Sequence, residues 1–167
     1  MTKSLLESCR QLLPKITFIE GKTFYWSPQT KSIHLDEGAM SEEHGQWALL
    51  HEVAHAILDH STYTNDAGLL ILEVEAWDKA QQLAKNLGIT ISSDHIEDCL
   101  NTYRDWLYAR STCPTCALNS LQVSSLDYTC LNCSTHWSVS QSRFCRPYRM
   151  QSKHKKTPSQ TANPVFR

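Results

Sequence analysis

Apolar and polar positions along the first third of the chain predict one short helix followed by three strands. Residues 3–13 have the spacing of a helix that Pro14 ends, and β-rich runs follow at residues 16–20, 23–27 and 32–36. The last two runs flank the turn sequence Ser27-Pro28-Gln29-Thr30. Together they predict a small antiparallel sheet.

Three longer helices are predicted after the strands. The first begins at Ser41 as its N-cap and runs to about His60, with Glu42 and Glu43 in the first turn, where the helix dipole favours negative charge. The second covers residues 66–87 and ends at Gly88, and the third covers residues 92–110. This order predicts an α+β fold in which the small sheet packs on the helix 41–60 and on the two helices that follow it.

The predicted helix 41–60 carries the motif His51-Glu52-x-x-His55. Because residues advance about 100° each along a helix, the two histidines are about 40° apart and can bind one ion from one face. Glu52 can contact a water on that ion, and this is the arrangement of zinc hydrolases in which the glutamate is the proton acceptor. His60 lies about 140° further round from His55 and is not expected to join while the helix continues. The alternative is an ordinary amphipathic helix with surface histidines.

Glu73 is the candidate for a third ligand because of its phase on the predicted helix 66–87. It falls in the middle of the apolar stripe, whereas Glu75 falls among polar residues and is expected to be solvated. A carboxylate on a buried face needs a compensating charge, which a zinc ion on the facing helix would supply. An inward-pointing Lys or Arg is the alternative partner.

Two segments, HEVAHAILDH at residues 51–60 and EVEAWDKA at residues 73–80, resemble the metallopeptidase domain of the ImmA/IrrE family, a compact gluzincin. That family has His-Glu-x-x-His, often a further His five residues on, and a later helix of the form Glu-x-x-Ala-(Asn/Asp)-x-Phe-Ala. The resemblance covers about residues 15–90. It implies a catalytic zinc on His51, His55 and Glu73 with Glu52 as catalytic base, and a DNA-bound repressor or similar regulator as substrate.

The chain departs from the family pattern at two positions on the second helix. Ala76 and Ala80 match, but Trp77 stands in place of the Asn/Asp and Lys79 in place of the Phe. The missing polar residue would normally help to orient a histidine ligand. The SprT-like group also joins His-Glu-x-x-His to a zinc ribbon, but it takes its third ligand from a later histidine, and no His lies between His60 and His95.

Charge divides the 167 residues into two parts. Residues 1–110 hold nine Lys/Arg and sixteen Asp/Glu, whereas residues 111–167 hold seven Lys/Arg and only Asp127 as an acid. We therefore predict a metallopeptidase-like domain at 1–110, a zinc ribbon with a basic and aromatic extension at 111–149, and a disordered basic tail at 150–167. The sequence has no signal peptide and no long apolar run, so a cytoplasmic protein without a membrane partner is expected.

The second part contains two Cys-x-x-Cys pairs, Cys113 with Cys116 and Cys130 with Cys133. Their separation predicts a zinc ribbon in which the four thiolates bind a structural zinc ion tetrahedrally and a hairpin lies between the pairs. A redox pair or an iron-sulfur cluster is the alternative. His136 and Cys145 are surplus to four ligands and are expected to be unliganded.

Two functions follow from these patterns. The first is a zinc metallopeptidase that hydrolyses a protein or peptide substrate. The second is a non-catalytic module that binds nucleic acid or protein through its basic ribbon, since residues 143–156 interleave basic and aromatic side chains. An ordinary basic tail with packing aromatics is the alternative for that segment.

Overall fold

The computed structural model describes residues 4–140 and 149–151, which belong to two compact units, Met1–Leu107 and Tyr108–Arg167. Helix α4 (Ser93–Ser111) contains the boundary between them. The extension at residues 141–148 and the tail from residue 152 onward lie outside the described residues. None of the described helices is long and apolar enough to cross a membrane.

The sheet of the first unit is mixed, so the prediction of an antiparallel sheet is only partly right. Strands β1 (Thr17–Glu20), β2 (Tyr25–Ser27) and β3 (Ser32–Leu35) have the order β1-β3-β2. The hairpin β2-β3 is antiparallel as predicted, but β1 pairs parallel with β3. The reason is burial: β3 carries Ile33 and Leu35, both fully buried, and takes the centre, which leaves β2 at an edge.

Helix α2 (Glu43–Ile57) is shorter than predicted at both ends. Ser41 is the last residue of a 3-10 turn, Gly38–Ser41, and Glu42 is the N-cap instead. The Asp36 carboxylate accepts hydrogen bonds from the first two N–H groups of that turn, and Gly45 lets the turn pack directly on α2. A Cβ atom at Gly45 would lie 2.0 Å from the carbonyl oxygen of Ala39.

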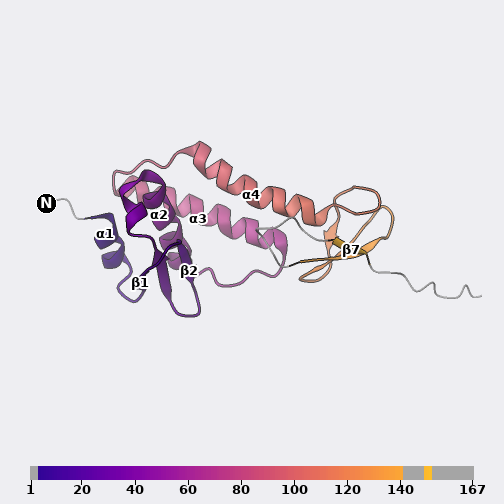
Figure 1. Ribbon diagram of the computed structural model, residues 1–167, viewed down its shortest axis with the longest axis horizontal. Coiled ribbons are helices and arrows are strands. Elements are labelled where there is room, and N and C mark those ends of the chain that lie inside the picture. Colours follow the sequence, from indigo (N-terminus) through magenta and orange to yellow (C-terminus); the bar gives the residue numbers. More distant parts are fainter. Residues whose placement is uncertain (1–3, 141–148, 152–167) are drawn as a thin grey trace, which may run out of the picture. The chain divides into compact units, whose positions relative to one another are not determined.

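The remaining helices agree closely with the predicted ranges, namely α1 (Leu5–Leu12), α3 (Asp66–Asn86) and α4. Gly88 follows α3 with φ 71°, the left-handed conformation expected of a residue that ends a helix. Helix α2 contacts α3 and the strands β2 and β3, and Figure 1 shows α2 beside the small sheet. Alanines on α3 and aliphatic side chains on α2 and β3 form a dense core between these elements: Ile33, Leu35, Leu49, Leu50, Val53, Ala76 and Ala80.

The second unit is built on an antiparallel sheet in the order β4-β5-β6-β7. The strands are β4 (Leu121–Gln122), β5 (Asp127–Thr129), β6 (His136–Val139) and β7 (Arg149–Gln151). Strands β4 and β5 form the predicted hairpin. Residues 150 and 151, predicted to begin the disordered tail, pair with β6 instead, because backbone pairing does not require apolar side chains.

Candidate functional site

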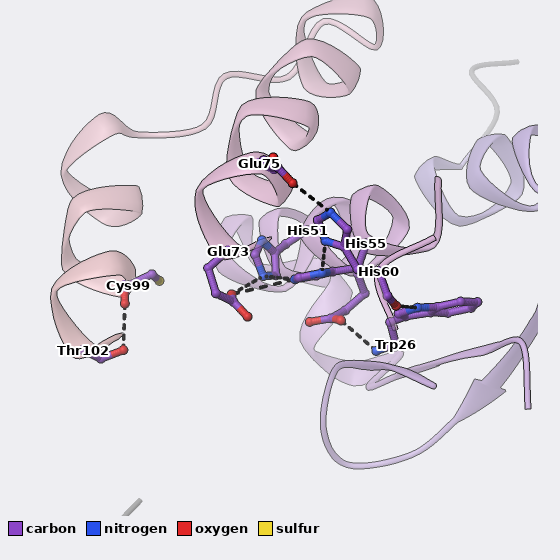
Figure 2. Close-up of polar contacts among 9 residues, drawn as sticks. Trp26, His51, His55, His60, Glu73, Glu75, Cys99 and Thr102 are labelled. Atoms are coloured by element: carbon purple, nitrogen blue, oxygen red, sulfur yellow. Dashed lines mark hydrogen bonds and ion pairs between the residues drawn. The ribbon is translucent and has the colours of Figure 1, made fainter. Parts of the chain in front are cut away.

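Helices α2 and α3 bring together three side chains that were predicted from the sequence to be metal ligands. His51 Nε2 lies 3.1 Å from His55 Nε2 and 3.2 Å from Glu73 Oε2, and His55 Nε2 lies 3.8 Å from that same oxygen. Figure 2 shows the three side chains pointing toward one another, the histidines from α2 and the glutamate from α3. Their side chains are only 11%, 12% and 8% exposed, respectively.

The spacing of these donor atoms fits a zinc ion. Zinc–nitrogen and zinc–oxygen bonds of about 2.0–2.1 Å in a tetrahedron separate neighbouring donors by about 3.3–3.4 Å. The three separations lie on either side of that value. Two imidazoles and a carboxylate are also a donor set that zinc prefers, and three protein donors leave a fourth position open, as in catalytic sites.

The charge at Glu73 is consistent with a ligand rather than with a neutral buried acid. Burial raises the pKa of its carboxyl, but hydrogen bonds and charges from His51 and His55 outweigh burial and hold the pKa well below its ordinary value. Glu73 therefore stays ionised. The alternative partner, an inward Lys or Arg, is not found near Glu73 among the described residues.

Glu52 lies beside the three donors without joining them. Its Oε2 atom accepts a hydrogen bond of 2.7 Å from the backbone N–H of Trp26 on the edge strand β2. Burial raises the pKa of its carboxyl, although the two histidines and the Trp26 N–H oppose the rise. A carboxylate with a raised pKa, fixed next to a candidate metal site, is suited to accept a proton.

His60 returns to the site, which the predicted continuous helix did not allow. Helix α2 ends at Ile57, and Asp59 takes a left-handed φ of 52°. This reversal brings His60 Nδ1 to 2.8 Å from His55 Nδ1, and places His60 Nε2 3.3 Å from a carboxylate oxygen of Glu75. Glu75 is half exposed as expected, but it is not simply solvated. Two signals in the sequence pointed this way: Asp tolerates the left-handed region, and the resembled family often has a His at this position.

Trp77 packs against the ring of His51 at the position where the resembled family has Asn or Asp. The two ring centroids are 4.2 Å apart and the planes are inclined by 32°. His51 Nδ1 is buried and, among the described residues, has no hydrogen-bond partner. The described part of the chain therefore contains no polar group that orients His51 through Nδ1.

The four ribbon cysteines also converge. Sγ separations are 3.6 Å for Cys113–Cys133, 3.5 Å for Cys116–Cys130 and 3.6 Å for Cys116–Cys133. Zinc–sulfur bonds of about 2.3 Å in a tetrahedron imply separations of about 3.8 Å, so the cluster also fits zinc.

Both Cys-x-x-Cys turns of the ribbon have the same local conformation. Ala117 and Ser134, each one residue after a second cysteine, have φ of 60° and 57°. Each donates its N–H to the carbonyl of the first cysteine of its pair at 3.0 Å. Hydrogen bonds led by that of Ser120 lower the pKa of the Cys130 thiol to about 6, which favours the thiolate that binds metal.

The residues predicted to be surplus to the ribbon site have different outcomes. His136 lies outside the cysteine cluster and its Nδ1 pairs with the Thr129 hydroxyl at 2.8 Å. Cys145 lies outside the described residues.

Comparison of the chain with models of protein families, with curated proteins and with solved structures found no match in any of the three. The assignment of a function therefore depends on the chemistry of the two clusters.

Proposed function

We propose that the protein is a zinc-dependent metallopeptidase that hydrolyses peptide bonds in a protein or peptide substrate. The observation that carries the proposal is the convergence of His51, His55 and Glu73, three buried donors at zinc-like spacing, with the Glu52 carboxylate fixed beside them. The second zinc ion, on the four cysteines, has a structural role because four thiolates leave no open position.

Bound at the open site, zinc would polarise the scissile carbonyl and acidify a water molecule there. Glu52 then acts as the proton acceptor: it takes the proton of the water as the oxygen attacks the carbonyl carbon. It delivers that proton to the departing amine when the C–N bond breaks. The Trp26 N–H fixes one carboxylate oxygen, which leaves the other free to carry the proton.

Strand β2 is suited to hold an extended substrate. Among the described residues it pairs only with β3, so one of its edges is open to a further strand. Main-chain hydrogen bonds along such an edge bind peptides without regard to their side chains. Because Trp26 lies on β2 and contacts Glu52 directly, a peptide on this edge would run next to the catalytic carboxylate.

The donor set of two helix histidines and a later glutamate is also that of a gluzincin, which supports the resemblance to the ImmA/IrrE family. We therefore extend the proposal to a cytoplasmic enzyme whose substrate is a DNA-bound regulator, recognised in part through the basic C-terminal region. Most of that region lies outside the described residues.

The test compares wild type with Glu52→Gln. A glutamine keeps the acceptor for the Trp26 N–H but cannot take a proton at neutral pH. We expect both proteins to hold two zinc ions and the variant to cleave peptides at least about 100-fold more slowly. The substrate is a peptide library made from digested whole-cell protein, and mass spectrometry identifies the new termini. Equal cleavage by both proteins, or none by wild type with two zinc ions bound, would contradict the mechanism and favour a binding module.

A further inference from the structure

A chain of contacts leads from a surface carboxylate to the ring of His55, one of the proposed metal ligands. Glu75 contacts His60 Nε2 at 3.3 Å, and His60 Nδ1 contacts His55 Nδ1 at 2.8 Å (Figure 2). We infer that His60 and Glu75 are positioning residues that hold His55 in the one tautomer able to bind zinc through Nε2. This inference rests on the proposed metal site.

The backbone of His60 is fixed on both sides, so the position of its ring is set by the fold. Its N–H donates to the carbonyl of His55 at 3.1 Å, and its own carbonyl accepts from the indole N–H of Trp26 at 2.8 Å. The preceding residue, Asp59, is paired with Lys31 at 2.5 Å. The His60 side chain is only 8% exposed, and its two ring nitrogens therefore depend on protein partners.

The protons along this chain have one consistent arrangement when a metal is bound. A neutral histidine that binds metal through Nε2 carries its proton on Nδ1. His55 Nδ1–H must then donate to the lone pair of His60 Nδ1. His60 consequently carries its own proton on Nε2, where the Glu75 carboxylate, which only accepts, is its partner.

The reverse arrangement is disfavoured at both ends. If His60 donated from Nδ1 to His55, its Nε2 lone pair would face the lone pairs of the Glu75 carboxylate. His55 would then carry its proton on Nε2, among the donor atoms of His51 and Glu73, and could not bind metal there. The charge on Glu75 therefore selects the metal-binding tautomer of His55 through one intervening ring.

In the described part of the chain, His51 has no contact at Nδ1 like the one that His60 makes with His55. Its Nδ1 is buried without a hydrogen-bond partner there, and Trp77 covers the ring. Among the described residues, hydrogen bonds at Nδ1 therefore orient only one of the two histidine ligands, His55. Loss of the contacts behind His55 should weaken the site by about 10- to 100-fold, the usual effect of removing such outer partners.

The first experiment measures zinc affinity by competition with a chromophoric chelator for wild type, His60→Ala, Glu75→Gln and Asp78→Asn. A glutamine at position 75 can donate as well as accept, so it loses the preference for one tautomer without a change of size. Asp78→Asn is the matched control, because it removes the same charge one turn further along α3. The four-cysteine site serves as an internal reference in every sample.

We expect the zinc affinity of the His51, His55 and Glu73 site to fall by about 10- to 100-fold in His60→Ala and by about tenfold in Glu75→Gln. Asp78→Asn should change neither affinity, and the affinity of the four-cysteine site should be the same in all four proteins. A wild type with two zinc ions whose affinities are unaffected by both changes would overturn this inference alone. A wild type that binds zinc only at the cysteines would overturn the proposed function as well.

The second experiment determines the tautomers directly. Two-bond ¹H–¹⁵N correlation spectra of the zinc-loaded protein, labelled at its eight histidines, distinguish Nδ1–H from Nε2–H rings. We expect His55 protonated on Nδ1 and His60 protonated on Nε2, and in Glu75→Gln a mixture at His60. A His60 ring protonated on Nδ1 in wild type would contradict the inference. A purely structural role for Glu75 would not alter these signals.

Discussion

The two candidate metal sites differ in how much of the fold each needs. The ribbon site takes four thiolates from two turns that lie seventeen residues apart, and both turns have the same conformation. The His51, His55 and Glu73 site takes its donors from two helices that a hydrophobic core holds together. Zinc binding at the ribbon site can therefore fold the residues around it. The His51, His55 and Glu73 site depends instead on a core that folds without the metal.

The sizes of the two cores explain this difference. The first unit buries a large apolar cluster that includes Ile33, Leu49, Leu50 and Trp77. Among the described residues, the buried cluster of the second unit consists of Tyr128, Trp137, Val139 and two of the four candidate zinc-binding cysteines. Zinc is therefore expected to supply much of the folding free energy of the second unit and little of that of the first.

Removal of zinc from the cysteines should have the largest effect. Zinc binding contributes roughly 10–16 kcal/mol to the folding of small structural zinc modules. Cys130→Ser should therefore unfold the second unit, with loss of ¹H–¹⁵N dispersion for residues after Tyr108, while the first unit keeps its spectrum. Cys99→Ser is the control, because this half-buried cysteine lies outside both clusters. A folded second unit without zinc would show that packing alone is sufficient to fold it.

Truncation of the core of the first unit should have an intermediate effect. Leu50 is fully buried on α2, and Leu50→Ala should lower the free energy of unfolding of that unit by about 2–5 kcal/mol in a denaturant titration. The exposed Ile71 on α3 provides the control, since Ile71→Ala should change the free energy of unfolding by less than about 0.5 kcal/mol. Zinc in the four-cysteine site should be unaffected by both. If Leu50→Ala no longer lowered the free energy of unfolding once zinc was removed, metal binding rather than packing would stabilise this unit.

A change at the edge strand should have the smallest effect. Trp26→Phe removes the indole N–H that bonds the His60 carbonyl but keeps the backbone N–H that fixes Glu52. The loss of one neutral hydrogen bond is worth about 1 kcal/mol, so the zinc affinity of the His51, His55 and Glu73 site should fall by about fivefold. The variant should still cleave peptides at saturating zinc. Complete loss of zinc would mean that Trp26 has a larger role than these contacts imply.

The sequence was sufficient to predict the donors because their positions follow local periodicity. His51 and His55 share a face by helical spacing, and the phase of Glu73 in an apolar stripe identified it as buried. The cysteine pairs were equally readable, because each turn supplies two ligands within four residues. Each of these predictions needed only a helix or a turn to form where the pattern indicated.

The features that were missed depend on where elements end and how they pair. The end of α2 at Ile57 and the left-handed Asp59 are what bring His60 to His55, and a continuous helix hid that contact. Strand β1 pairs with β3 rather than β2 because burial favours β3 at the centre, a competition between strands that no single run reveals. The Trp26 contact to Glu52 joins residues 26 positions apart and follows only from the packing of β2 on α2.

If His51, His55 and Glu73 bind a metal ion independently of the ribbon, the zinc content of the purified protein will show it. Wild type, Glu73→Ala and Asp78→Asn are purified without added metal and compared. We expect about two zinc ions per chain in wild type and Asp78→Asn, and about one in Glu73→Ala. About one zinc ion in all three proteins would contradict this expectation and leave the ribbon as the metal site.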